Sequence, residues 1–146
     1  MPAAFTIRVL AWPEALPLAR LVREQVFVEE QKVPRELELD EWDEGCEHAV
    51  ACDSRGEAIG TARLLPDGRI GRMAVLGEWR RRGVGTALLE ALLERARKRS
   101  IRRITLHAQT HAAAFYRRFG FNERGEEFLE AEIPHVEMTL ELPSRE

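Results

Sequence analysis

The hydrophobic pattern alternates between the period of a strand and the period of a helix along the chain. The stretch FTIRVL, from Phe5 to Leu10, alternates as a half-buried strand does. The apolar positions after it keep a helical spacing, and Pro17 is tolerable in a first turn. They predict a first helix on these residues: Leu18, Leu21, Val22, Val26 and Phe27.

Three β-patterned stretches, separated by turn residues, follow in the middle of the chain. They are His48–Cys52, Ala58–Pro66 and Arg69–Leu76. The turn sequences between them are DSRG, at 53–56, and Asp-Gly, at 67–68. Turns this short join neighbouring antiparallel strands, so the pattern predicts an antiparallel meander.

A strongly amphipathic helix and another strand come next. Its apolar face consists of helically spaced residues: Val84, Ala87, Leu88, Ala91 and Leu92. Leu89 and Leu93 widen this face. The strand Arg103–Gln109 follows, and a strand–helix–strand order implies a parallel crossover.

The end of the chain predicts a short helix and two more strands. The helix covers His111–Phe119 and ends at Gly120, and the strands lie around 121–128 and 135–142. The prediction is an α+β fold in one domain, 1–146. Its sheet is mixed, mostly antiparallel and six- or seven-stranded, with one parallel pair and flanking helices.

Composition places the chain among soluble globular proteins. It has 146 residues, of which 45% are hydrophobic and 32% charged, and no apolar run long enough to cross a bilayer. The two cysteines, Cys46 and Cys52, are too few for a disulfide framework, so a reduced cytoplasmic protein is expected. Cys46 and His48, with Asp43 nearby, lack a second ligand pair, and no metal site is assigned.

Charge is distributed unevenly. The segment from Glu29 to Glu47 holds nine acids against two bases. Its part after the first helix, through Pro34 and on to Gly45, is predicted to be a loop with one short helical turn. The segment from Arg69 to Arg103 holds eleven bases against three acids. The two segments predict one negative and one positive surface. The basic segment lacks an aromatic stacking platform, which argues against a nucleic-acid partner.

The start of the amphipathic helix carries the strongest chemical signal. Three arginines, Arg80 to Arg82, stand where a helix usually has a polar cap and acids, and Gly83 and Gly85 follow them. Positive charge there is unfavourable unless an anion binds. Backbone N–H groups at a helix N-terminus beside glycines are suited to phosphate or pyrophosphate.

Two common phosphate motifs do not fit. A P-loop needs a lysine after its second glycine, and neither glycine is followed by one. A dinucleotide-binding fingerprint needs a small residue where Leu88 stands and an acid where Thr105 stands. The motif that remains is R-x-x-G-x-G, from Arg80 to Gly85, after an antiparallel strand.

This motif resembles the coenzyme A pyrophosphate loop of the GNAT (GCN5-related) N-acyltransferases. AAAFYRRFGF, from Ala112 to Phe121, resembles the second signature of that superfamily. Three further stretches look like its ElaA-like branch: VFVEEQKVP at 26–34, LHAQT at 106–110 and FLEAEIPHVEM at 128–138. The resemblance spans nearly the whole chain and implies acetyl-coenzyme A as cosubstrate.

The resemblance assigns roles to specific residues. Backbone groups on the strand before the loop would hold the pantetheine arm, with the Val75 N–H as oxyanion donor. Gly71 would be a bulge where the strands splay. The full set of implied cofactor contacts is Met73, Ala74, Val75, Arg80, Arg81, Arg82, Gly83, Val84, Gly85, Thr86, Phe115 and Tyr116.

Tyr116 matches the tyrosine that protonates the departing thiolate in the superfamily, and its alternative role is to pack against the cofactor. The general base stays open, since no acid lies on the strand at 69–72. The candidates are Glu29, Asp40, Asp43, His107, His135 or an ordered water. The acidic segment favours a cationic acceptor, with these residues as its expected contacts: Glu29, Asp40, Asp43 and His135.

The leading function is an acetyl-coenzyme A-dependent N-acetyltransferase acting on a primary amine of a small molecule or peptide. A non-catalytic acyl-coenzyme A sensor or partner-binding module on the same scaffold is the alternative, and nucleic-acid binding is disfavoured. No membrane partner is expected, and the chain is expected to be a monomer or homodimer.

Overall fold

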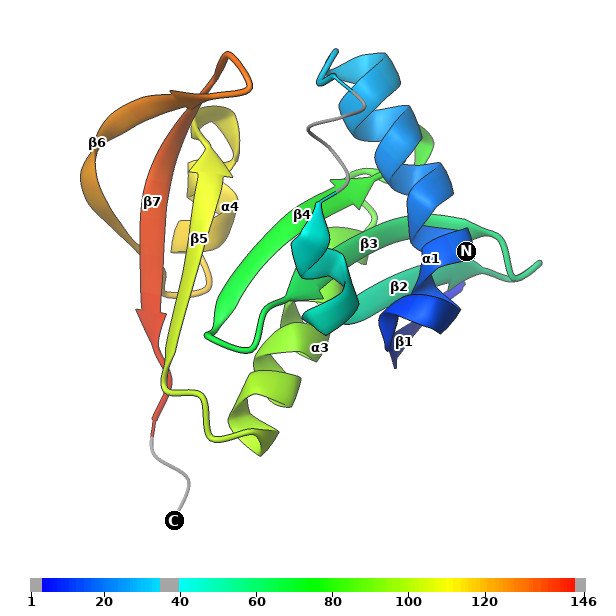
Figure 1. Cartoon of the computed structure of the whole chain (residues 1–146), viewed down its shortest axis with the longest axis horizontal. Helices are drawn as coiled ribbons and strands as arrows, with labels where there is room; N and C mark the ends of the chain where they lie inside the picture. The colour runs from blue at the N-terminus through cyan, green and yellow to red at the C-terminus, as the bar shows by residue number, and fades with distance from the viewer. Residues whose placement is uncertain (1–3, 35–39, 144–146) are drawn as a thin grey trace.

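A seven-stranded mixed sheet organises the protein, whose computed structural model describes residues 4–34 and 40–143 (Figure 1). The strand order is β1-β2-β3-β4-β5-β7-β6. The strands are β1 (Phe5–Leu10), β2 (Glu47–Asp53), β3 (Ala58–Leu64), β4 (Arg69–Val75), β5 (Arg103–Gln109), β6 (Asn122–Glu130) and β7 (Ile133–Glu141). Only β4 and β5 pair in parallel, and the other neighbours are antiparallel. The predicted fold class is therefore confirmed.

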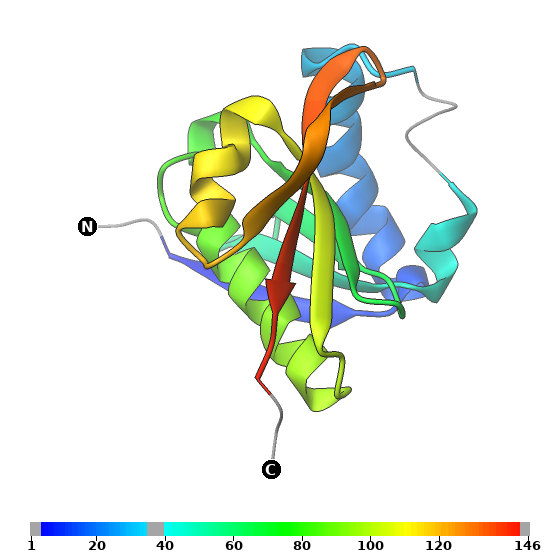
Figure 2. The same ribbon diagram turned by 90° about the vertical axis from the view of Figure 1, so that its left-hand side faces the viewer.

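Helices cover both faces of the sheet. One face carries α1 (Trp12–Arg23) and its continuation η1 (Glu24–Glu30), and the other carries α3 (Val84–Lys98) and α4 (Ala113–Arg117), as the edge-on view in Figure 2 shows. Short 3₁₀ segments are η2 (Glu41–Gly45), η3 (Gly77–Trp79) and η4 (Thr110–Ala112). We call the two faces the α1 face and the α3 face.

The main core lies between the sheet and α3. Leu88, Leu89 and Leu92 of α3 are fully buried, as the helical spacing predicted. They pack with the alternate residues Ile104, Leu106 and Ala108 of β5. A smaller cluster on the α1 face joins Val22 and Val26 to Ala74 of β4. The sheet is thus anchored on both faces near the middle of β4.

The first helix departs from its prediction at both ends. It begins at Trp12, with Pro13 in its first turn, so that Pro17 lies inside the helix instead of in the first turn. Proline fits the first turn because the N–H it lacks has no partner there in any case. From Glu24 the backbone widens into a seven-residue π-helix, η1, which contains the predicted helical positions Val26 and Phe27.

The parallel strands β4 and β5 diverge after two residue pairs, and we call the gap between them the splay. Arg69 pairs with Thr105 and Ile70 with Leu106, and then β4 and β5 separate. Beside this point β4 bulges: Arg63 pairs with Gly71 and Thr61 with Ala74, which leaves Arg72 and Met73 opposite one residue of β3. The positive φ lies at Arg72 (49°), so the bulge is one residue beyond the predicted Gly71.

Gly68 closes the narrow end of the splay. Its carbonyl accepts from Thr105 N at 3.2 Å, its φ is 99°, and a Cβ there would collide with the Arg103 carbonyl oxygen. Only glycine fits this combination of left-handed backbone and close approach. The Asp67–Gly68 turn therefore sets the position at which the two strands meet.

Candidate active site

The N-terminus of α3 is open for an anion. Gly83 occupies the cap position with φ 85°, no side chain caps the helix, and no acid lies in the first turn. The N–H groups of a first helical turn have no partner within the helix and carry the positive end of its dipole. Above Gly85 lies the ring of Phe115, 3.6 Å from where a Cβ would stand. The predicted pyrophosphate residues 81–86 thus cover the end of the loop and the first turn of α3, with an α4 aromatic beside them.

Two of the three arginines are held by neighbouring groups. Arg80 forms a bidentate ion pair with Glu30, with N–O distances of 2.7 and 2.6 Å, and its Nε donates to the Val75 carbonyl at 3.0 Å. The guanidinium of Arg82 stacks over the Trp79 ring at 5.3 Å. Arg81 has φ 64°, which helps the chain turn into Gly83. Glu30 was not expected at this site, and no motif pointed to it.

The edge of β4 that faces β5 offers its backbone beyond Ile70. Leu76 N donates to the Ile59 carbonyl at 2.9 Å across β3 and β4. Paired residues in an antiparallel ladder alternate between bonded and non-bonded, so the amide and carbonyl of Val75 point to the opposite edge, into the splay. The Arg80 bond to the Val75 carbonyl agrees with this direction. An extended ligand could therefore pair with Met73–Val75 as a strand would.

Tyr116 lies at the same opening, on the α3 face. Its hydroxyl donates to the Met73 sulfur at 3.6 Å. Its ring packs edge-on against Phe115 and Phe121. Burial raises the pKa of the Tyr116 phenol to about 12. The phenol is thus protonated at neutral pH, and a thioether is a weak acceptor that a better one could replace.

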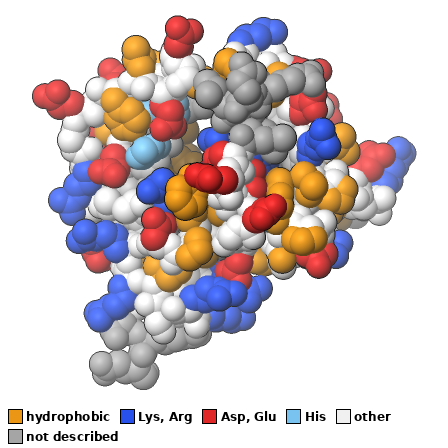
Figure 3. Space-filling model, viewed as in Figure 1, with side chains coloured by type: hydrophobic (Ala, Val, Ile, Leu, Met, Phe, Trp, Pro, Cys, Tyr) orange, Lys and Arg blue, Asp and Glu red, His pale blue; other side chains and the backbone are white. Residues whose placement is uncertain are grey.

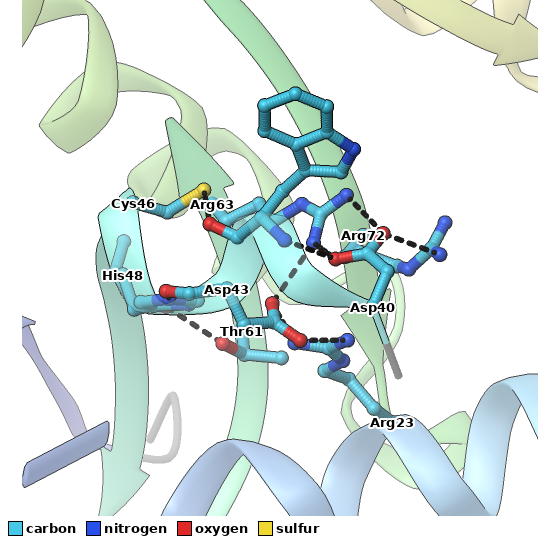
Figure 4. Close-up of polar contacts among 10 residues, drawn as sticks. Arg23, Asp40, Asp43, Cys46, His48, Thr61, Arg63 and Arg72 are labelled. Carbon is cyan, nitrogen blue, oxygen red and sulfur yellow. Dashed lines mark hydrogen bonds and ion pairs between the residues drawn. The ribbon is translucent and has the colours of Figure 1, made fainter. Parts of the chain in front are cut away.

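The described part of the acidic segment is tied to the sheet by a buried ion-pair network (Figure 4). Asp43, 1% exposed, accepts from Arg23 at 2.8 Å and from Arg63 at 2.9 Å. Asp40 accepts two bonds from Arg63 and one, at 3.1 Å, from Arg72. Sequence pattern did not reveal this network, although an arginine among the apolar residues near the end of β3 implies an acidic partner.

Electrostatics in this network favour the charged carboxylates. Burial alone would raise the pKa of Asp43, but the hydrogen bonds and charges of Arg23 and Arg63 outweigh it and lower the pKa. For Asp40, burial is likewise outweighed, by Arg63 and Arg72. Both carboxylates therefore have arginine partners within the protein. The acceptor-binding role expected of them stays a prediction, and residues 35–39 of the segment lie outside the described residues.

A second polar cluster lies on the α1 face of the sheet, on the side of the splay formed by β5, β7 and β6. Glu130, from β6, has Oε1 3.0 Å from His107 Nδ1 and Oε2 3.7 Å from His135 Nε2. Phe128 packs against both imidazoles. In Figure 3 the surface is hollowed beside the histidine side chains. Sequence reasoning singled out both histidines separately but missed Glu130.

The residue directly after η1, Gln31, contacts β5 on this side of the splay. Gln31 and Gln109 exchange amide hydrogen bonds, of which the shorter is 2.9 Å. Gln109 also lies 2.7 Å from His111 Nε2. Glu29, the other predicted acceptor residue, is exposed two residues before Gln31. Asp40 and Asp43 are instead bound to arginines in the ion-pair network, so the four predicted acceptor residues do not form one cluster of contacts.

The described residues contain no group of three or more His, Cys, Asp and Glu side chains able to hold a metal ion. Cys46 and Cys52 are free and buried, and burial raises the pKa of the Cys46 thiol to about 11. Within 4–34 and 40–143, no helix has the length and apolar character needed to cross a membrane.

Comparisons with known proteins agree with this geometry. Residues 14–142 match the family model described as an acetyltransferase (GNAT) domain. YjcF of Bacillus subtilis, named an uncharacterized N-acetyltransferase, is 40% identical over 129 residues, which are 86% of this chain and 91% of that protein.

Two solved structures share the fold over most of the chain. An acyl-CoA N-acyltransferase from Pseudomonas aeruginosa has a TM-score of 0.80 at 32% identity and covers 94% of this chain and 98% of its own. Escherichia coli ElaA has a TM-score of 0.83 at 29% identity, covering 92% and 98%. The chain belongs to the GNAT acetyltransferase family, in its ElaA-like branch, and is an acyltransferase whose cosubstrate is an acyl-coenzyme A.

Proposed function

We propose that this protein transfers an acetyl group from acetyl-coenzyme A to a primary amine by direct attack of the amine on the thioester. The observation that carries the proposal is the uncapped N-terminus of α3 next to the open edge of β4. A diphosphate fits the first feature and an extended amide chain fits the second. Coenzyme A combines the two groups in one molecule.

The residues of the loop and of β4 would bind and orient the cosubstrate. Amides from Arg81 to Thr86 would hold the pyrophosphate, with Arg80 and Arg82 supplying positive charge outside the loop. Met73 would pair with the pantetheine arm, and Ala74, which pairs with Thr61 of β3, would lie beside the arm without bonding to it. The Val75 N–H, which faces the splay, would donate to the thioester oxygen as negative charge develops there.

Tyr116 would complete the reaction as general acid. Its hydroxyl lies beside Met73, one of the residues proposed to hold the arm, and its raised pKa keeps the proton on the phenol. A thiolate is a better acceptor than the Met73 thioether. The proton would therefore pass to the departing sulfur, and the Phe115 ring would line the same slot.

A matrix of acyl-coenzyme A donors and amines, read by release of free thiol, tests the proposal. We expect amine-dependent thiol release with acetyl-coenzyme A, and release reduced in Tyr116→Phe. Binding of acetyl-coenzyme A with no release for any amine would overturn the proposal and favour a non-catalytic sensor on the same scaffold.

A further inference from the structure

The β6–β7 hairpin places one carboxylate between two imidazoles. Glu130 Oε1 accepts from His107 Nδ1 at 3.0 Å, while Oε2 lies 3.7 Å from His135 Nε2, beyond hydrogen-bond distance. Glu130 is half-exposed, whereas His135 is only 6% exposed. The cluster therefore meets solvent through Glu130 and is closed behind His135.

Hydrogen bonding fixes which nitrogen of His135 carries the proton in the neutral ring. Nδ1 lies 2.6 Å from the Ile133 carbonyl oxygen, and a carbonyl only accepts, so Nδ1 must donate. Nε2 then presents a lone pair toward Glu130 Oε2, which also presents lone pairs. Two acceptors this close, with no donor between them, suit a ligand that brings positive charge and several N–H groups.

The position of His135 matches the place where an acceptor must enter. His135 pairs with Gln109 across β7 and β5, so both side chains lie on the α1 face, where Gln109 meets Gln31. Gln109 is three residues beyond the last β4–β5 pair, level with Met73 and Ala74 on the other side of the splay. His135 lies on β7, the strand next to β5, so it is about 5 Å further from the splay than Gln109, the β5 residue with which it pairs.

We propose that Glu130 and His135 form the subsite for the amino group of the acceptor, and that His135 Nε2 takes the proton which the amine loses before attack. The proposal rests on the proposed function and names the acceptor chemistry: a primary ammonium group. His107 and Phe128 are positioning residues. His107 holds Oε1 of the carboxylate, and Phe128 contacts both rings, at centroid distances of 5.0 and 6.0 Å.

Each proton in the proposed reaction has a donor and an acceptor. The ammonium donates N–H bonds to Glu130 Oε2 and His135 Nε2, and one proton moves to Nε2. The imidazolium keeps its Nδ1–H bond to Ile133 and is stabilised by the carboxylate. The amine nitrogen forms the C–N bond to the thioester carbon, and the C–S bond breaks with its electron pair on sulfur. The thiolate takes the Tyr116 proton, and a second proton from the nitrogen restores the phenol.

Other charged groups near His135 come from three elements. On β7, Glu137 lies two residues away on the same face, opposite His107 of β5. On β6, Arg124 pairs with Glu137 in register, and its Nε donates to Thr139. On η1, Glu30 is paired with Arg80. Glu130 is thus the carboxylate nearest to Nε2 among these groups.

A binding experiment tests the subsite without turnover. The ¹⁵N resonances of His135 are followed in the coenzyme A-bound protein while butylammonium or tetramethylammonium chloride is added. We expect butylammonium to shift the Nε2 resonance and tetramethylammonium, which has no N–H, to leave it unchanged. The shift should disappear in Glu130→Gln and persist in Glu132→Gln, which removes a charge from the same hairpin. No shift, or equal shifts with both cations, would overturn the subsite.

Kinetics test the proton transfer. With an amine that the wild type acetylates, His135→Gln should lower kcat by about 10²–10⁴-fold, because the amine then has no side chain to take its proton. Glu130→Gln should chiefly raise the KM for the amine, since the ammonium group loses its carboxylate partner. Acetyl-coenzyme A affinity should stay unchanged in both variants.

An unchanged kcat in His135→Gln, with the wild type active, would overturn the base and leave the proposed function standing. If the wild type acetylates no amine, the proposed function fails, and the resonance shifts still decide whether the ammonium subsite exists.

Discussion

Arg80 and Glu30 are joined by a bidentate ion pair although fifty positions separate them in the chain. Glu30 ends the π-helix on the α1 face, and Arg80 begins the loop that we propose for the pyrophosphate. The pair lowers the pKa of Glu30, chiefly through the Arg80 hydrogen bond. It links η1, on the α1 face, to the loop before α3.

Removing the Glu30 carboxylate that pairs with Arg80 should raise the affinity for acetyl-coenzyme A. In Glu30→Gln the arginine keeps its bond to Val75 but loses its counter-charge, so its full charge acts on the pyrophosphate. Exposed ion pairs are worth about 0.2–1 kcal/mol, so we expect acetyl-coenzyme A affinity to rise by about 1.4- to fivefold. Calorimetry at low and high salt measures this, because the gain should fade with screening. Glu29→Gln should give a smaller gain, and equal gains would show only a change in net charge.

A substitution at Gly85 should affect acetyl-coenzyme A binding and the stability of the ligand-free protein differently. An aspartate there would place a carboxylate where the pyrophosphate is proposed to lie, yet its Cβ would make only an ordinary contact with Phe115. An acid in a first helical turn also stabilises the helix by about 0.3–1 kcal/mol. Gly85→Asp should therefore keep or raise the melting temperature without ligand and abolish the stabilisation by acetyl-coenzyme A.

Differential scanning fluorimetry measures both effects, with Gly85→Ala as the matched control for side-chain bulk and NAD and ATP as comparison ligands. Gly83 is less suitable, because at φ 85° any side chain adds backbone strain. Stabilisation by NAD equal to that by acetyl-coenzyme A would contradict the proposed ligand.

Tyr116→Phe should remove the proton but keep the packing. We expect kcat to fall by about 10²–10⁴-fold, with the lower end favoured because a thiolate is already a stable leaving group. Acetyl-coenzyme A affinity should change little. Since burial raises the pKa of Tyr116 to about 12, the wild-type rate should show no loss from phenol ionisation below about pH 11. Full kcat with weakened cofactor binding would make Tyr116 only a wall of the slot.

Asp43→Asn should destabilise the fold strongly. The change leaves Arg23, 1% exposed, without its carboxylate partner in Asp43, and breaking a buried pair costs about 3–5 kcal/mol. Urea unfolding measures the loss. Glu41→Gln, an exposed acid in the same turn, should cost less than about 0.5 kcal/mol. Equal stability of Asp43→Asn and the wild type would show that the network carries no net free energy.

The same carboxylate makes stability depend on pH. The pKa of Asp43 is lowered in the folded protein, so its contribution is fully present above the unfolded value of about 3.9. It is lost as pH falls through the folded value. Between pH 7 and 5 the free energy of unfolding should therefore not change because of Asp43, and in Asp43→Asn the acid-induced decrease should become shallower.

Local pattern was sufficient for the sheet and for the loop at the start of α3. Alternation in β1 and β5 and the spacing of Val84 to Leu92 reflect burial on one face, and this pattern is present in the residues of each segment. The strands β2 and β3 are buried along nearly their whole length, and the turn residues at their ends marked them instead. The R-x-x-G-x-G loop could be interpreted because a helix start without a polar cap is itself unusual.

Pairings between distant segments could not be predicted in this way. Asp43 appeared as one acid among nine, and only the fold shows that Arg23 and Arg63 enclose it. Glu130 stands in a hairpin where exposed acids are common, and its meaning comes from His107 and His135 on other strands. Helical spacing also does not distinguish an α-turn from the wider turn at Glu24–Glu30.

That wider turn sets the direction in which the residues after it point. A π-turn takes up one residue more than an α-turn, so the same residues wound as a regular helix would each advance by a larger angle, about 100°. Glu30 would then turn away from Arg80, and Gln31 from Gln109, although every side chain in both bridges remained. Two proteins with the same residues in these bridges could thus differ in whether the two sides of the splay are joined, depending on how this one segment is wound.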